Sequence, residues 1–115
     1  MDERLQKALD AANFMISFNN QKRILQEKYL TSCEYYHNGG SFTLGYDLIN
    51  FVKVLLDTGN NKDVILIDNY NLPIQIEDLN SFFSDILDKF HQARNSFYNN
   101  FELLKRSRTV ESFLL

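Results

Sequence analysis

The sequence predicts an α+β protein, mostly α, in which two long terminal helices pack together and a short helix and a β-hairpin lie between them. Three observations lead to this prediction. Residues 78–108 repeat apolar side chains at intervals of three and four, which places them on one face of a helix. Residues 1–33 form a second long stretch that contains neither Gly nor Pro. Residues 63–77 hold a β-branched run and then alternating apolar and polar residues, a pattern typical of a hairpin.

The size and composition of the chain favour one domain over residues 1–115. An aromatic share of 14% is more than a disordered chain carries, so we expect a packed core. The net charge of −3 argues against a protein that binds the DNA backbone through a basic stripe. The sequence has no apolar window of membrane-spanning length, no signal-peptide core and a single cysteine, which cannot form an internal disulfide. We therefore expect synthesis in the cytoplasm and no membrane partner.

Residues 1–33 are predicted to form the first long helix. Its apolar side chains fall into two sets, which drift round the helix. The sets are Leu5, Ala8, Leu9, Ala12, Met15 and Ile16, and Phe14, Phe18, Leu25 and Tyr29. Similar length and complementary aromatic residues make this helix the natural partner of the C-terminal helix. Packing within one chain and self-assembly through the unused parts of the faces are both open, and they are compatible.

Residues 34–43 contain the clearest turn, His37-Asn38-Gly39-Gly40. Asn-Gly and Gly-Gly favour the positive φ angles that a tight reversal requires. The flanking aromatic residues suit a short hairpin. A plain turn between two helices fits the same residues, so both interpretations stay open.

Residues 44–58 are predicted to form the short helix. Its apolar side chains are Leu48, Phe51, Val52, Leu55 and Leu56. Thr43 is a candidate N-cap, and Gly59 stands where a C-terminal cap would fall. Because almost no polar residue interrupts the apolar run, we expect this helix to be buried on more than one side.

Residues 63–77 form the predicted hairpin, with the turn at residues 68–71. Pro73 cannot donate a ladder hydrogen bond, so it must lie at a strand start or an outer edge. A lone hairpin is marginal in water, so its apolar face must pack on helices. Asp78 is the predicted N-cap of the helix that follows.

Residues 78–108 carry the most regular apolar face of the chain. The face contains Leu79, Phe83, Ile86, Phe90, Ala93, Phe97 and Leu104, and Phe82, Leu87, Tyr98 and Phe101 widen it. We expect Phe90 and Phe97 to be buried against the first helix. The face is wider than one helix covers, so we predict self-association, with Phe97 and Phe101 among the partner-binding residues.

Signals for chemistry are weak. His37 and His91 stand far apart and belong to no metal-binding motif. Asp85 and Asp88 lie one turn apart on a polar helix face, where solvated charges are expected. The basic cluster at residues 105–108 falls in the last helical turn, where cations complement the helix dipole. We predict no catalytic residue, no metal, no cofactor and no direct nucleic-acid contact, and hence a protein that is not an enzyme.

Three short segments and the helix that follows them carry a resemblance. The segments are Val64-Ile-Leu-Ile-Asp68, Asn71-Leu-Pro73 and Ile76-Glu-Asp-Leu79, and the aromatic helix ends Leu104-Lys-Arg-Ser-Arg108. This arrangement resembles small proteins of tailed, T4-like bacteriophages, including tail-associated ones. The resemblance implies a virion or assembly component without catalysis, which works by self-association and by docking on larger phage proteins. Its expected location is the host cytoplasm during synthesis, with the virion as a further one.

Residues 109–115 are predicted to be a tail that ends in Phe113, Leu114 and Leu115. Exposure of these apolar side chains to water is unfavourable. We therefore expect that the tail either folds back on its own domain or anchors in a pocket of a partner. The ending resembles those with which T4-like phage proteins, the late-transcription coactivator among them, dock on the sliding clamp. It departs from them where Ser112 separates Glu111 from Phe113. The alternative function is therefore a phage regulatory adaptor that docks by this tail.

Overall fold

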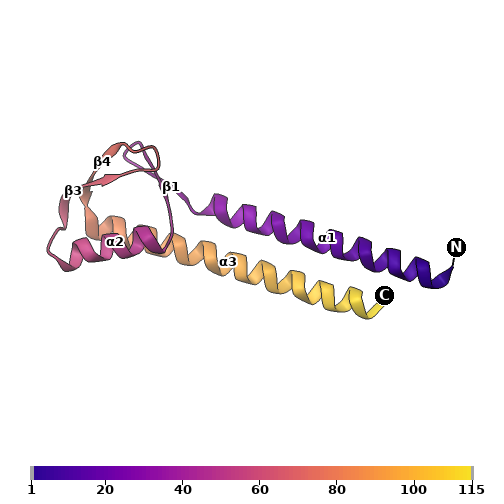
Figure 1. The fold of residues 1–115 in the computed structure, drawn as a ribbon. Coiled ribbons are helices and arrows are strands. Elements are labelled where there is room, and N and C mark those ends of the chain that lie inside the picture. Colours follow the sequence, from indigo (N-terminus) through magenta and orange to yellow (C-terminus); the bar gives the residue numbers. More distant parts are fainter. Residues whose placement is uncertain (1, 115) are drawn as a thin grey trace. The chain divides into compact units, whose positions relative to one another are not determined.

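The computed structural model describes the backbone of residues 2–114 and the side chains of residues 2–107. Figure 1 shows the elements in chain order: α1 (Glu3–Ser32), β1 (Glu34–His37), β2 (Gly40–Thr43), α2 (Tyr46–Asp57), β3 (Lys62–Ile67), β4 (Pro73–Asp78) and α3 (Leu79–Leu114). Along the chain, a short helix and the antiparallel strands lie between two long helices. The predicted fold class, α+β and mostly α, is therefore confirmed.

The chain divides into two compact units. The helical unit consists of Met1–Tyr29 and Asn95–Leu115, and the mixed unit consists of Leu30–Arg94. The first part of α3 therefore belongs to the mixed unit and the rest to the helical unit. Our prediction of a single domain over residues 1–115, which came from the length of the chain, stays a prediction.

The helical unit is a pair of antiparallel helices with a shallow seam. The rings of Tyr29 on α1 and Phe97 on α3 stack with centroids 4.9 Å apart. Along α1 the side chains turned into the seam recur at helical spacing. They are Phe14, Phe18, Leu25 and Tyr29, all buried or half-buried. The predicted packing of the two long helices is therefore present, although Phe97 is half-buried rather than buried as we expected.

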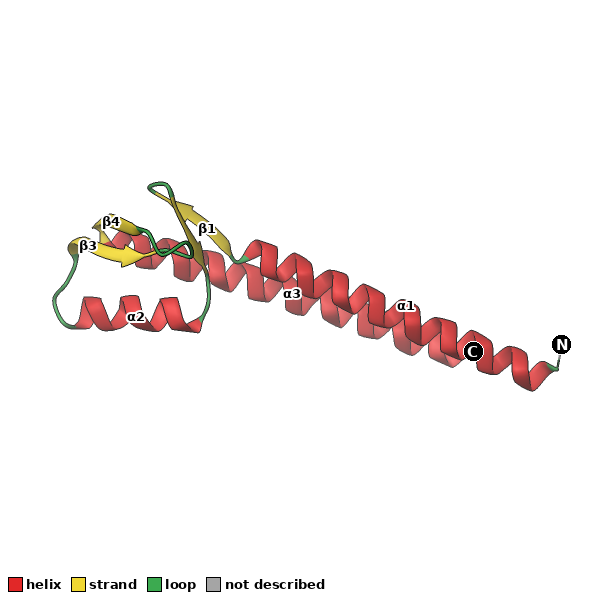
Figure 2. Ribbon diagram, turned by 45° about the horizontal axis from the view of Figure 1, so that its top comes forward, coloured by secondary structure: helices red, strands yellow, loops and turns green. Residues whose placement is uncertain are grey.

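The mixed unit contains two antiparallel hairpins, visible in Figure 2. Residues 34–43, for which a plain turn was also open, form the hairpin β1–β2, with Tyr35 opposite Phe42. Its turn uses positive φ angles at Asn38 (48°) and Gly39 (79°), as the sequence suggested. Gly40 is required for another reason, because a Cβ there would lie 2.5 Å from Cγ1 of Ile74.

The second hairpin, β3–β4, was predicted almost to the residue. Pro73 is the first residue of β4 and pairs with Ile67, a position where its missing N–H breaks no ladder bond. Asn71 adopts a φ of 61° in the turn, which Asn tolerates better than most residues. Inside the unit, the buried hairpin residues are Leu66, Ile74 and Ile76.

Two expectations for α2 are wrong, and one is confirmed. Thr43 does not cap α2, because it pairs with Glu34 at the end of β2, and Gly45 is the N-cap instead. The helix is not buried on more than one side: Val52 is fully buried, whereas Phe51 and Val54 are exposed. The physical reason is that the unit supplies packing partners for one face only.

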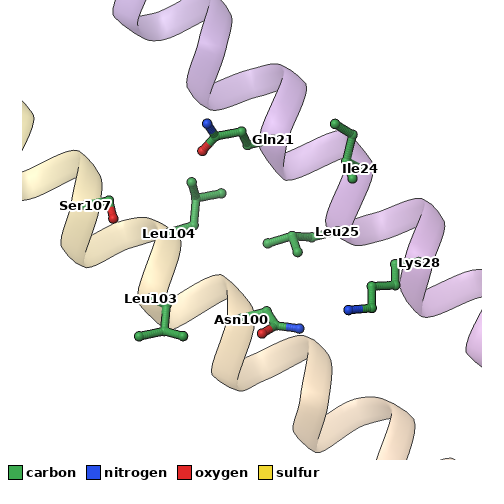
Figure 3. Close-up of a pocket in the computed structure, with 8 residues that line it drawn as sticks. All are labelled: Gln21, Ile24, Leu25, Lys28, Asn100, Leu103, Leu104 and Ser107. Carbon is green, nitrogen blue, oxygen red and sulfur yellow. The ribbon is translucent and has the colours of Figure 1, made fainter.

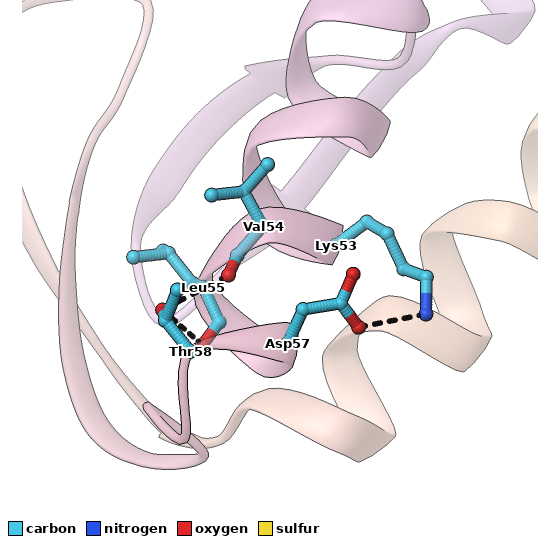
Figure 4. A network of polar contacts seen from close by, with 5 residues as sticks. All are labelled: Lys53, Val54, Leu55, Asp57 and Thr58. Atoms are coloured by element: carbon cyan, nitrogen blue, oxygen red, sulfur yellow. Dashed lines mark hydrogen bonds and ion pairs between the residues drawn. The ribbon is translucent and has the colours of Figure 1, made fainter.

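Gly59 ends α2 as predicted. Its N–H donates to the Leu56 carbonyl (3.1 Å), that of Asn60 donates to the Leu55 carbonyl (2.9 Å), and φ of Gly59 is 87°. The hydroxyl of Thr58 also donates to the carbonyl of Val54, at 2.9 Å (Figure 4).

α3 begins where the sequence indicated. The Asp78 carboxylate accepts the N–H of Ser81 at 3.2 Å, which confirms the N-cap. The face turned to the core is the predicted one and includes Phe82, which we expected to widen it, while Phe83 and Leu87 are half-buried. It contains Leu79, Phe82, Ile86, Phe90 and Ala93, all buried. The ring of Phe90 meets Tyr46 of α2 at 5.4 Å, a contact within the mixed unit that the sequence did not suggest.

The predicted end of this helix at residue 108 is wrong. The backbone continues as helix through Leu114, over the segment that we expected to be a tail. No Gly or Pro occurs there to stop a helix, so helical hydrogen bonding propagates. The side chains of Phe113 and Leu114, and all of Leu115, lie outside the described residues.

Candidate functional site

The titratable side chains that might carry chemistry are dispersed. His37 is half-buried and its ring meets Phe82 edge-on at 5.1 Å, while His91 is exposed. Cys33 is buried with a free thiol. Within residues 2–107 no group of three or more His, Cys, Asp or Glu residues comes together in a way that would hold a metal ion.

The most elaborate polar arrangement surrounds Asp68, a buried carboxylate at the end of β3. One oxygen, Oδ2, accepts the N–H of Ser41 at 3.0 Å. The other, Oδ1, accepts the N–H groups of Tyr70 (3.0 Å) and Leu72 (2.9 Å). The amides of Ser41 and Leu72 lower the pKa of Asp68, with help from that of Tyr70 and against the effect of burial. The carboxylate therefore stays charged and is committed to three backbone donors.

Asp68 and its neighbours tie the two hairpins together. The N–H of Asn69 donates to the Ser41 carbonyl at 2.8 Å, and its side chain donates to the Thr43 hydroxyl at 2.9 Å. From the other side, the side chain of Asn38 donates to the Gln75 carbonyl at 2.9 Å. These contacts hold the hairpins in a fixed relation, so the Asp68 cluster has a structural role.

Apolar surface is the more informative feature of the mixed unit. Ile65 and Ile67 point from the outer face of β3 and are 55% and 61% exposed. A groove of about 410 Å³ runs beside Ile67 and is lined on the helix side by Tyr46 and Leu48. Phe51 and Val54 of α2 are exposed as well. Such apolar surface, presented by two neighbouring elements, is typical of a protein-binding face.

The helical unit has an open groove in its seam (Figure 3). It has a volume of about 390 Å³ and is lined by Gln21, Ile24, Leu25 and Lys28 of α1 and by Asn100, Leu103, Leu104 and Ser107 of α3. Figure 3 shows Leu25 and Leu104 pointing into the space between the helices. The lining mixes apolar, amide and ammonium groups without a convergent polar set, so the groove is a loosely packed stretch of the seam.

A second apolar stripe runs along α1. It consists of Leu5, Leu9, Ala12 and Ile16, all exposed, and we call it the outer stripe. At 100° per residue these four positions lie on the side of the helix roughly opposite the seam residues Phe14 and Phe18. Their spacing of four, three and four is that of a helix-packing seam. The two sets of apolar residues that the sequence shows along this helix therefore lie on two separate faces, the seam and the outer stripe.

The predicted partner-binding residues divide into two groups. Phe97 and Phe101 lie one turn apart on α3 with ring centroids at 6.4 Å, and both are half-buried inside the helical unit. Phe113, Leu114 and Leu115 lie outside the described side chains. Sequence reasoning missed Ile65 and Ile67 as surface residues. A signal was present, because they pair with Gln75 and Pro73, which belong to the outer face of the alternating strand.

None of the helices in the part of the chain that the structure describes has the length and apolar character to cross a membrane. A comparison of the sequence and fold with protein-family models, curated proteins and solved structures finds no match.

Proposed function

We propose that the chain is a non-catalytic structural or assembly subunit that acts through protein–protein contacts, self-association among them. The observation that carries this proposal is the outer stripe of α1. A helix that has already packed one apolar face into its own unit presents a second, exposed face with helix-packing spacing. Exposed Leu9 and Ile16 are unfavourable in water unless another chain covers them.

The sequence resemblance to small proteins of T4-like bacteriophages supports a setting in phage assembly. In that setting the partners are further copies of the chain and larger phage proteins. The protein would be found in the host cytoplasm during synthesis and in the virion afterwards. The net charge of −3 supports protein partners rather than nucleic acid.

Sedimentation equilibrium of the purified chain at tens of micromolar tests this proposal. We expect a species heavier than the monomer, and we expect Leu9→Lys/Ile16→Lys to weaken association, because it places charges in the outer stripe. The matched control is Gln6→Lys/Ser17→Lys, which adds the same charge at two exposed positions on another side of α1. A monomeric wild-type chain at these concentrations would contradict the self-association part of the proposal.

A second candidate is a phage regulatory adaptor that docks on the sliding clamp by its C-terminal Phe-Leu-Leu. The resemblance of the ending, Glu111 to Leu115, to the clamp-docking endings of T4-like phage proteins supports it. Deletion of residues 113–115 should then abolish capture of a T4-like sliding clamp at an unchanged melting temperature. A large fall in melting temperature would instead show that these residues stabilise the fold.

A further inference from the structure

The turn between β1 and β2 carries the one Asn-Gly pair of the sequence, Asn38-Gly39. The backbone nitrogen of the residue after an asparagine can attack the side-chain amide carbon and close a five-membered succinimide ring. Glycine in that place favours the attack, because it has no Cβ to shield the nitrogen and its backbone adopts more conformations. The sequence therefore marks Asn38 as a candidate for deamidation.

The structure leaves the reacting groups of this turn accessible. Asn38 and Gly39 are both exposed and form a two-residue loop between His37 and Gly40, which pair at the ends of the strands. Among the described residues, the N–H of Gly39 has no hydrogen-bond partner. The attacking nitrogen is therefore free, and water reaches the site.

Two other asparagines lack this free neighbouring N–H. Asn71 also lies in a turn with a positive φ, but the N–H of Leu72 donates to the Asp68 carboxylate at 2.9 Å. Asn95 precedes a small residue, Ser96, but both lie inside α3, where each N–H bonds to a carbonyl one turn earlier. A nitrogen held in such a bond does not approach the side-chain carbon of the residue before it.

We propose that Asn38 is a site of spontaneous deamidation in the folded chain. The Gly39 nitrogen forms a bond to Cγ of Asn38 and gives up its proton, and the side-chain nitrogen leaves as ammonia. Water then opens the succinimide at either of its carbonyls, which gives aspartate or isoaspartate. The whole reaction consumes a water molecule and releases an ammonia molecule. This inference does not depend on the self-association in the proposed function.

Deamidation removes one of the bonds that join the two hairpins. Nδ2 of Asn38 donates to the Gln75 carbonyl at 2.9 Å, and this nitrogen is the atom that leaves. The carboxylate that replaces the amide is an acceptor only, so it places negative charge against a carbonyl oxygen and offers no proton to it.

The isoaspartate product adds a further disturbance, because it inserts an extra carbon atom into the main chain of a two-residue turn. Gly40, which follows the turn directly, is buried. A Cβ at Gly40 would lie 2.5 Å from Cγ1 of Ile74, so the chain has little room to shift toward β4. We therefore expect the modified chain to be less stable than the unmodified one.

Incubation of the full chain in warm, mildly alkaline buffer made with water that carries heavy oxygen tests the reaction. Tandem mass spectrometry of the digested chain then locates the gain. We expect Asn38 to gain about 3 Da, from the loss of ammonia and the uptake of labelled water, roughly tenfold or more faster than Asn71 and Asn95. The proposal is wrong if Asn38 in the folded chain stays unmodified over the time in which it converts in a urea-unfolded sample.

Asn38→Asp tests the consequence for the hairpins directly. It removes the donor to Gln75, and we expect the urea midpoint to fall by roughly 0.5 M. The matched control is Asn50→Asp, which makes the same change of charge at an exposed position of α2 and should leave the midpoint near that of the wild type. Equal midpoints for the two variants would show that loss of the Asn38 amide does not loosen the hairpins. The isotope measurement on the unmodified chain decides the deamidation site even if Asn38→Asp does not fold.

Discussion

The two units of the chain bury their apolar side chains to different degrees. The mixed unit has a core to which both hairpins, α2 and α3 contribute. Its most deeply buried side chains are Cys33, Val52, Ile76, Leu79, Phe82 and Ile86. In the helical unit, Phe18 is the only described side chain that is buried. The other side chains in the seam are half-buried. The mixed unit therefore has a closed core that stabilises it, whereas the helical unit depends on a half-exposed seam.

The largest expected effect comes from a matched pair of substitutions, Phe90→Ala and Phe97→Ala. Phe90 is 3% exposed in the mixed core, so its truncation leaves a cavity and should cost about 3–5 kcal/mol. Phe97 sits in the half-exposed seam, and its loss should cost roughly 1–2 kcal/mol because less apolar area returns to water. Urea unfolding of both variants gives the two values. Equal losses would show that the seam is packed as well as the core, and the comparison between units would fail.

Gly40→Ala probes how tightly the two hairpins of the mixed unit are packed. The new Cβ would lie 2.5 Å from Cγ1 and 2.9 Å from Cδ1 of Ile74, so the side chain or the hairpin has to shift. We expect a loss of about 1–3 kcal/mol in urea unfolding, the usual cost of overpacking. Gly45→Ala is the control, since nothing lies within 4 Å of its Cβ and its φ of −174° is open to any residue. If both variants are as stable as the wild type, the hairpins are not in close contact.

The pH dependence of the mixed unit should reflect Asp68. Three backbone N–H groups stabilise its carboxylate, so the folded-state pKa lies below the ordinary value of about 3.9. A depressed pKa contributes stability that is fully present above the unfolded value and is lost as pH falls through the folded value. The stability difference between wild type and Asp68→Asn should thus be constant at pH 5–7 and should begin to shrink as the pH falls below about 4 toward the lower folded-state pKa. Thermal unfolding across this range measures the gap, and a constant gap down to pH 3 would show that the carboxylate charge does not matter.

Local patterns predicted which elements form and where their faces lie. The three- and four-residue spacing of residues 78–108 identified the buried Leu79, Ile86, Phe90 and Ala93. Asp78 and Gly59 were assigned from capping chemistry alone, because a cap satisfies backbone groups within a few residues of itself. These features depend on short stretches of chain, which a sequence displays directly.

Features that depend on residues far apart in the sequence were not predicted. Thr43 has the chemistry of an N-cap, but it pairs with Glu34 and accepts a hydrogen bond from Asn69, 26 residues further on. The turn at Asp68 was expected, whereas its bond to Ser41 across 27 residues was not. Ile65, Leu66 and Ile67 are all apolar. The sequence alone does not show that Leu66 is buried whereas Ile65 and Ile67 are exposed. Which apolar residues stay exposed is therefore the property of this molecule that the sequence predicts least well.

The smallest expected effects come from two surface ion pairs, one in each unit, that are alike in geometry and exposure. Lys53 and Asp57 of α2 lie 2.9 Å apart with side chains 59% exposed (Figure 4). Arg23 and Glu27 of α1 lie 2.8 Å apart with side chains 61% and 60% exposed. Exposed i,i+4 pairs contribute about 0.3–0.5 kcal/mol, so Lys53→Ala and Arg23→Ala should each lose no more than that, and 1 M NaCl should remove the difference from wild type. Equal small losses would confirm that the units differ in buried apolar contacts and not in surface charge. A loss above about 1 kcal/mol for Arg23→Ala alone, retained in high salt, would show that the aliphatic part of Arg23 covers apolar surface of the helical unit and that its seam extends further round α1.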